Sequence, residues 1–187
     1  MNFDILALIF SGIFIGLLVI PIFWTGDPSL PTSMRVRRKM LTVLPDFLPD
    51  IQCSKIYELG SGWGGLANAL AKKYPDKTVV GVELSPVPYF FSRLRQAYDQ
   101  KPNLIFNFCD FFSVDLSDAN LVVCYLSPKT MKKLSRKLKL ELPKDSLIIS
   151  NTFALRDWDA VETQISDDIY KSPILLYKID SNMHKLL

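Results

Sequence analysis

A glycine-rich segment with an acidic residue at its start is the part of this sequence best suited to chemistry. It has the order Glu58-Leu-Gly60-Ser-Gly62-Trp-Gly64 and lies between an apolar stretch and a helical pattern. Glycines allow positive φ angles and close approach of a ligand, and the N-terminus of a helix offers free N–H groups to an anion. With Gly65, the segment also fits the dinucleotide pattern G-x-G-x-x-G. It therefore predicts a site for a nucleotide or a nucleoside.

Two acidic residues separate the ligands that this segment could hold. We expect Glu58 at the carboxyl end of the first strand, where the pyrophosphate of a dinucleotide would meet an unfavourable negative charge. S-adenosylmethionine has no phosphate, and its ammonium group suits a carboxylate at this position. Glu83 ends the next β-rich stretch, where an acid accepts hydrogen bonds from both ribose hydroxyls of either ligand. Glu58 therefore favours S-adenosylmethionine, whereas Glu83 favours a nucleoside in general.

A third acid follows the third apolar stretch, in the order Cys109-Asp110-Phe111. Asp110 could accept a hydrogen bond from an adenine amino group while apolar neighbours cover the ring. The same residue also suits a turn or a helix N-cap. The pattern leaves both interpretations open.

Strand and helix patterns alternate along the chain after residue 27. This alternation predicts an α/β fold, a mainly parallel twisted sheet with helices on both faces, which is Rossmann-like. We also expect an edge strand within 172–179. The expected strands cover 55–59, 78–84, 104–109, 121–126 and 146–153, and the expected helices cover 33–44, 66–74, 86–100 and 128–142.

The first 26 residues differ from the rest, because Asp4 is their single charged side chain. Ile5 to Trp24 gives 20 residues without a charge, which as a helix would span about 30 Å, the thickness of a bilayer core. A buried core helix is usually shorter, and a signal peptide would need a basic start and a cleavage site. We therefore predict two parts, a transmembrane anchor over 1–26 and a catalytic domain over 27–187.

Basic residues between 35 and 39 follow this stretch, and the positive-inside rule places the body on the cytoplasmic side of a membrane. A bacterial inner membrane is the first expectation, and an organellar inner membrane is the second. Residues 129–139 hold six further Lys and Arg in a helical pattern. They suit a solvated helix face or, given the anchor, contact with anionic lipid headgroups.

Composition excludes several classes of function. There are 22 Lys and Arg against 19 Asp and Glu, and this net charge of +3 is too mild to indicate a nucleic-acid binder. The three cysteines lack metal-ligand spacing, so we predict no metal. His184 is the single histidine, which makes a mechanism based on a histidine base improbable. The sequence predicts no particular oligomeric state.

The glycine segment, with Glu83 and Asp110 each one strand further on, resembles motif I and its successors in class I S-adenosylmethionine-dependent methyltransferases. More narrowly, residues 27–160 resemble small membrane-anchored methyltransferases that include the mitochondrial ATP synthase c-subunit lysine methyltransferase and bacterial relatives. The resemblance extends over Pro28–Thr32, Val122–Pro128 and Ser150–Phe153. It implies S-adenosylmethionine as cofactor and a lysine of a protein as acceptor. The predicted anchor places that protein at or near the membrane.

The resemblance also implies roles for individual residues. Glu58, Gly60, Gly62 and Gly64 would hold the methionine part, Glu83 the ribose, and Asp110 with Phe111 the adenine. Thr32 matches the segment that closes over the cofactor, and Leu126 lies in the motif beside the transferring methyl group. Many relatives have an acid followed by Gly-Arg where this chain has Trp63-Gly64-Gly65.

Methyl transfer from a sulfonium depends on alignment and desolvation, so no dedicated base is required and no catalytic residue is assigned. Four residues could line a slot for the acceptor: Tyr125, Ser127, Asn151 and Phe153. Two other functions stay open from the sequence. One is a short NAD-dependent oxidoreductase, which Glu58 disfavours, and the other is a cofactor-binding membrane scaffold without activity.

Overall fold

The computed structural model describes residues 3–25, 32–45, 48 and 55–180. Within the helix at residues 3–25, the side chains at positions 14, 18 and 20–25 are outside this description. The helices are α1 (Phe3–Thr25), α2 (Met34–Val43), α3 (Gly65–Lys73), α4 (Pro86–Asp99), the short 3-10 helix η1 (Phe111–Ser113) and α5 (Pro128–Glu141). The strands are β1 (Lys55–Leu59), β2 (Thr78–Glu83), β3 (Leu104–Phe108), β4 (Ala119–Cys124), β5 (Leu147–Asn151), β6 (Glu162–Ile165) and β7 (Pro173–Lys178).

The strands form one seven-stranded sheet in the order β3-β2-β1-β4-β5-β7-β6. The first five strands in this order are parallel, and β7 runs antiparallel to both β5 and β6. The chain moves outward from β1 to β3 and then returns to place β4 on the other side of β1. This reversal is a topological switch point, where open α/β sheets bind ligands at the carboxyl ends of their strands.

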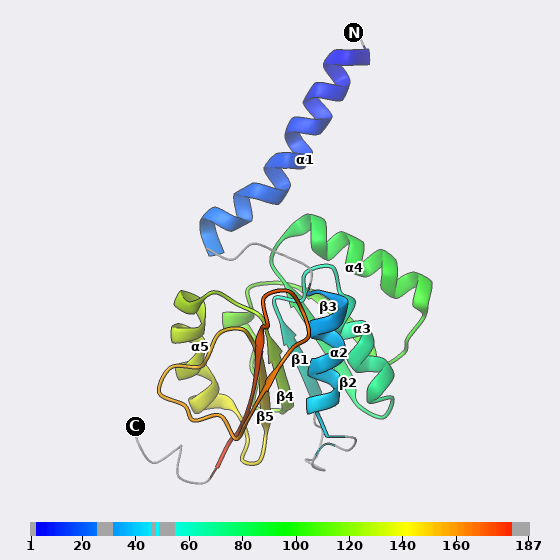
Figure 1. The fold of residues 1–187 in the computed structure, drawn as a ribbon. Helices are drawn as coiled ribbons and strands as arrows, with labels where there is room; N and C mark the ends of the chain where they lie inside the picture. Colours follow the sequence, from blue (N-terminus) through cyan, green and yellow to red (C-terminus); the bar gives the residue numbers. More distant parts are fainter. Residues whose placement is uncertain (1–2, 26–31, 46–47, 49–54, 181–187) are drawn as a thin grey trace.

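Helices cover both faces of the sheet (Figure 1). On one face, Val36 and Met40 of α2 pack with Leu70 of α3 in a buried apolar cluster. On the other face, α5 contributes Met131, Leu134 and Leu138 to a second cluster. Their spacing places these three side chains on one side of α5. The structure thus confirms the predicted Rossmann-like arrangement.

Local sequence signals explain where two of these helices begin. The Ser33 hydroxyl accepts a hydrogen bond from the Val36 N–H at 3.3 Å and caps α2. The Ser127 hydroxyl caps α5 by accepting from the Thr130 N–H, and Pro128 occupies the first turn. Proline fits this position because the first helical N–H groups have no partner within the helix.

One difference from the expected elements lies near β5. The sequence predicts a strand to residue 153, but β5 ends at Asn151 because Thr152 has a φ of 68°. The Phe153 N–H then donates to the Asn151 carbonyl at 2.8 Å, which closes a tight turn. The strand expected within 172–179 forms as β7, but it is not an edge strand, because it pairs with β5 on one side and with β6 on the other. The edge strand is β6, which the sequence did not predict.

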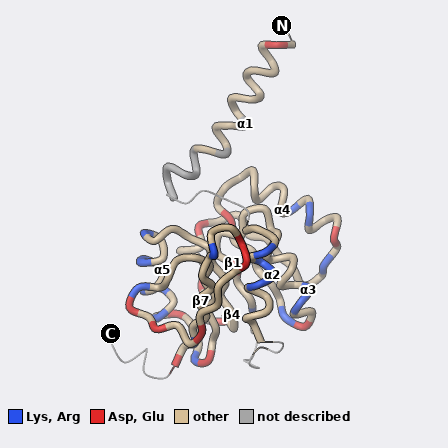
Figure 2. The backbone as a smooth tube through the Cα atoms, in the orientation of Figure 1, with Lys and Arg blue, Asp and Glu red and all other residues tan. Residues whose placement is uncertain are grey.

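Helix α1 extends away from the sheet (Figure 1), and its described portion carries no Lys or Arg (Figure 2). Over the described residues alone, no helix reaches the length and hydropathy that crossing a membrane requires. The transmembrane anchor predicted over 1–26 is therefore not confirmed.

Candidate active site

A cavity of about 730 Å³ opens at the carboxyl ends of the central parallel strands. This volume suits a small organic ligand such as a nucleoside. The walls come from the loops after β1, β2, β3 and β4, together with parts of α2 and α5. The predicted site residues that line it are Thr32, Glu58, Gly60, Glu83, Asp110, Phe111, Tyr125 and Leu126.

The glycine turn after β1 forms the floor of this site. Gly60, Gly62 and Gly64 have φ angles of 73°, 52° and 72°, which other residues rarely adopt. The N–H groups of Gly60 and Ser61 both donate to the Val82 carbonyl at 2.9 Å, so the turn is fastened to the neighbouring strand β2. The backbone path explains why glycine recurs at every second position.

Glu83 links the glycine turn to the loop after β2. One of its carboxylate oxygens accepts from the Gly62 N–H and the other from the Ser85 N–H, each at 2.7 Å. Each carboxylate oxygen has a second lone pair. The buried carboxylate can therefore accept further hydrogen bonds from hydroxyl groups in the cavity while it stays fixed by the backbone.

Glu58 is 5 % exposed, and its Oε2 atom has no hydrogen-bond partner in the described protein. Burial raises the pKa of its carboxyl group to about 8; a backbone hydrogen bond from Ala67 opposes the rise, and the charge of Glu83 adds to it. An orphaned buried carboxylate is costly unless a cation joins it. The methionine ammonium of S-adenosylmethionine would supply that cation, so the donor set fits the predicted cofactor.

The raised pKa of Glu58 predicts that cofactor affinity depends on pH. Below about pH 8, Glu58 must lose its proton before it pairs with an ammonium, so we expect affinity to rise about tenfold for each pH unit up to that point. Above it, the α-amino group of the ligand, whose pKa is about 7.7–8.0, loses its own charge. Calorimetric titration with S-adenosylmethionine between about pH 6 and 9 should show tightest binding near 8.

A Glu58→Gln variant is the matched control for this pH dependence, because the amide keeps the size of the side chain and does not titrate. We expect this variant to bind S-adenosylmethionine more weakly. We also expect it to lose the acidic limb of the pH profile, which is the fall in affinity as the pH decreases. An acidic limb that persists unchanged in the variant would show that another group causes it.

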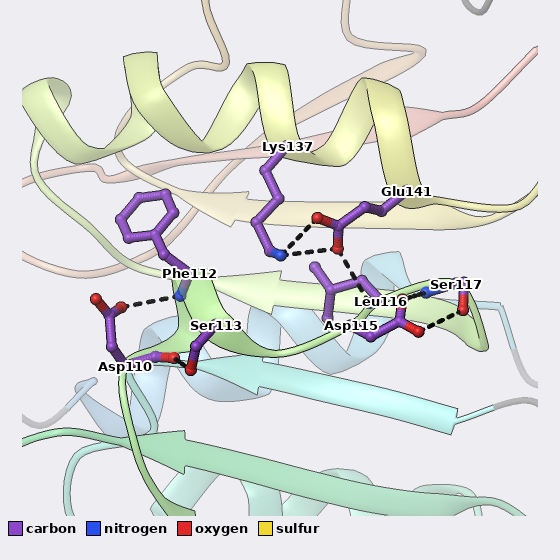
Figure 3. Close-up of polar contacts among 8 residues, drawn as sticks. All are labelled: Asp110, Phe112, Ser113, Asp115, Leu116, Ser117, Lys137 and Glu141. Carbon is purple, nitrogen blue, oxygen red and sulfur yellow. Dashed lines mark hydrogen bonds and ion pairs between the residues drawn. The ribbon is translucent and has the colours of Figure 1, made fainter.

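Asp110 and Phe111 lie after β3, at the edge of the cavity. The Asp110 carboxylate accepts from the Phe112 N–H at 2.9 Å and caps η1, as Figure 3 shows. Asp110 therefore serves as an N-cap and also lines the cavity. This position is consistent with both roles that the sequence left open, a helix N-cap and an acceptor for an adenine amino group. One carboxylate oxygen caps η1, and the other makes no hydrogen bond to a described residue.

Arg37 of α2 lines the cavity and was not among the predicted site residues. Its Nη1 atom donates to the Gly65 carbonyl at 2.9 Å, and its charge opposes the raised pKa of Glu58. In the sequence, this arginine belongs to the basic segment that follows the apolar first 26 residues. The helical spacing of Val36 and Met40 indicates a buried face beside it, but no sequence pattern shows that this face meets the glycine turn.

The four predicted slot residues do not all reach the cavity. Tyr125 lines it, and the Tyr125 and Phe153 rings lie nearly parallel with centroids 6.4 Å apart. Ser127 caps α5, and Asn151 is buried at the end of β5. Ser127, Asn151 and Phe153 are absent from the lining, as are Gly62 and Gly64, whose positions are set by the backbone path of the turn.

No group of three or more potential metal ligands occurs among the residues that the structure describes. Cys109 is partly exposed and Cys124 is buried, and both are free. Cys53 and His184 lie outside the described residues.

Solved structures of known proteins share this fold. An RNA methyltransferase from Salinibacter ruber, solved with S-adenosyl-L-homocysteine, matches with a TM-score of 0.69 and 24 % identity over 81 % of this chain and 95 % of its own. A precorrin-6y C5,15-methyltransferase from Geobacter metallireducens matches with a TM-score of 0.58 and 16 % identity over 79 % and 89 %. At these identities the likeness shows the fold.

The sequence comparisons are more specific. A curated protein from Saccharolobus islandicus, named protein-lysine N-methyltransferase, is 29 % identical over 161 residues, which is 81 % of this chain and 93 % of that protein. Fold, site and matches together define a class I S-adenosylmethionine-dependent methyltransferase. The family model described as the ANTKMT methyltransferase domain matches residues 58–162, and the chain belongs to this family.

These findings confirm the predicted enzyme class and its cofactor. They give no support to the alternative of an NAD-dependent oxidoreductase. The roles assigned to single residues stay predictions, as does the division at residue 26.

Proposed function

We propose that this methyltransferase transfers methyl groups to a lysine side chain of a protein. The observation that carries this proposal is the relative named protein-lysine N-methyltransferase, which aligns along 93 % of its own length. The glycine turn, the three acids and Tyr125 all lie within residues 58–162, which the family model matches. A protein acceptor is also consistent with a cavity that opens to the surface beside α5.

In this proposal the two buried acids orient the cofactor. Glu58 pairs with the ammonium group of the methionine part, and Glu83 accepts from the ribose hydroxyls. Asp110 and Phe111 hold the adenine, and the turn at Gly60 to Gly64 allows close approach of the methionine part. Thr32 and Leu126 also line the cavity and would contact the cofactor there.

The acceptor enters beside Tyr125, near the carboxyl end of β4. S-adenosylmethionine supplies a methyl group already activated on a sulfonium, so the protein needs to align the amine and exclude water. A lysine attacks only as the neutral amine, and desolvation near the Tyr125 and Phe153 rings lowers the pKa of its ammonium form. These side chains do not have to accept a proton for the transfer to proceed.

We also propose that α1 anchors the enzyme to a membrane, with the body on the cytoplasmic side. Phe3, Leu8 and Phe10 are among its large apolar side chains and are 84 %, 72 % and 73 % exposed. Such a surface is unfavourable in water and favourable in lipid. The substrate would then be a protein at or near that membrane, in a bacterial inner membrane or an organellar one.

Transfer of a labelled methyl group tests the proposed acceptor. The purified full chain in detergent micelles is incubated with methyl-labelled S-adenosylmethionine and a membrane extract, and the proteins are hydrolysed to amino acids. We expect the label in methyllysine. Label in another amino acid, or in nucleic acid, would contradict the proposal.

Two controls separate this outcome from the inactive scaffold. The Glu83→Ala variant should transfer little label, and a soluble extract should receive less label than the membrane extract. Binding of S-adenosylmethionine without transfer to either extract would favour a scaffold that lacks activity.

A further inference from the structure

Four basic side chains of α5 form one row along the cavity. Their positions follow the spacing i, i+3, i+4, i+7, which places them on a single side of a helix. All four are exposed and all four line the cavity, and Figure 2 shows basic positions along α5. We call this row the cationic stripe; it consists of Lys129, Lys132, Lys133 and Arg136.

The stripe differs from the other basic residues of the same helix. Lys137 forms an ion pair with Glu141 at 2.7 Å, as Figure 3 shows, and Lys139 lies over the Trp158 ring. Within the described part of the chain, none of the four stripe residues forms an ion pair. The Lys133 ammonium instead lies 3.8 Å from the centroid of the Phe112 ring, at the cavity wall.

This placement is unfavourable for the helix by itself. Neighbouring like charges at i, i+3 and i, i+4 destabilise a helix, and Lys129 adds positive charge to the first turn, where the helix dipole is already positive. An anion in the cavity would relieve both effects. The sequence interpretation of these residues as a solvated face or a lipid contact did not include their position at the cavity.

We propose that the cationic stripe binds acidic side chains that flank the acceptor lysine in the substrate protein. This inference rests on the proposed lysine transfer. The stripe and Tyr125 line the same cavity, so a peptide whose lysine lies at Tyr125 has its neighbouring residues against the stripe. Lys129 to Arg136 covers seven helical steps, about 10 Å, which equals roughly three residues of extended chain.

The stripe also acts on the acceptor itself. Its positive charge disfavours a protonated lysine and lowers the pKa of the acceptor, which favours the neutral amine that transfer requires. The acidic flank compensates for this repulsion by supplying the attraction that brings the peptide into the cavity. Lysines without an acidic flank would be poor substrates.

A library of lysine-centred peptides tests this inference. The full chain in micelles is incubated with the library and methyl-labelled S-adenosylmethionine, and labelled peptides are sequenced. We expect Asp and Glu to be enriched within about three residues on one side of the labelled lysine. We also expect a Lys132→Glu, Lys133→Glu double variant to prefer Lys and Arg at these positions, with kcat/KM for acidic peptides reduced at least about tenfold.

Lys72→Glu is the matched control, since Lys72 is exposed on α3 and does not line the cavity. Labelled peptides without acidic enrichment, or a double variant with unchanged preference, would overturn the inference and leave lysine transfer intact. No labelled lysine in any peptide would overturn the lysine function, and the inference with it.

The remaining alternative is that the cationic stripe binds the phosphate groups of RNA or of a lipid surface. Polyuridylate RNA and phosphatidylglycerol vesicles are each added to the peptide reaction of the wild type and the double variant. If either one binds through the stripe while peptides show no acidic preference, the stripe serves a phosphate surface and the proposal is wrong.

Discussion

A Gly64→Ala substitution is expected to destabilise the fold by about 2–5 kcal/mol. Gly64 has a φ of 72°, and alanine in this left-handed region costs about 1–2 kcal/mol. A Cβ atom there would also lie 2.6 Å from Cζ of Phe106 and 2.9 Å from Cβ of Ser92. Phe106 is buried, so the overlap adds about 1–3 kcal/mol of overpacking. Chemical denaturation of the full chain in micelles measures the loss.

Gly62→Ala is the matched control two residues away. Gly62 has a φ of 52°, but no atom lies within 4 Å of the position that its Cβ would take. We expect it to lose only the backbone cost, about 1–2 kcal/mol. Equal losses for the two variants would show that packing against Phe106 does not constrain the turn.

A Glu83→Ala substitution is expected to weaken binding of S-adenosylmethionine by about tenfold to a hundredfold. The variant loses the carboxylate that would accept from the ribose, and it leaves the N–H groups of Gly62 and Ser85 without their acceptor. A hydrogen bond to a charged group contributes about 1.5–3 kcal/mol, and about 1.4 kcal/mol is tenfold in affinity. Calorimetric titration of the full chain measures the change.

Two further variants serve as controls for the loss of affinity in Glu83→Ala. Glu83→Gln keeps one acceptor oxygen and should bind with intermediate affinity, and Glu162→Ala on the exposed strand β6 should bind as the wild type does. If Glu83→Ala retains full affinity, the ribose assignment is wrong.

Much of the fold could be predicted because strands and helices alternate with clear signals. Pro86 and Pro128 mark helix starts, and the apolar stretches at 55–59 and 78–84 coincide with β1 and β2 nearly residue for residue. The end of β5 could not be predicted, since Thr152 adopts a positive φ without the glycine that usually signals one.

Some residues of the candidate site could likewise be predicted from the sequence, and others could not. Glu58 and Glu83 could be placed because parallel strands bring their carboxyl ends to one edge of the sheet. Arg37 and the cationic stripe could not, because their position depends on how α2 and α5 pack over that edge. Helical periodicity gives the side of a helix that is buried, but it does not give the neighbours of its polar side.

Calorimetry of the full chain in micelles tests the central claim most directly. This claim is that the cavity binds S-adenosylmethionine and that Glu58 excludes a pyrophosphate. The titrants are S-adenosylmethionine and NAD, at about pH 8, where Glu58 and the ligand ammonium can pair. We predict saturable binding of S-adenosylmethionine and no binding of NAD at the same concentrations. Binding of NAD with equal or higher affinity would contradict the account.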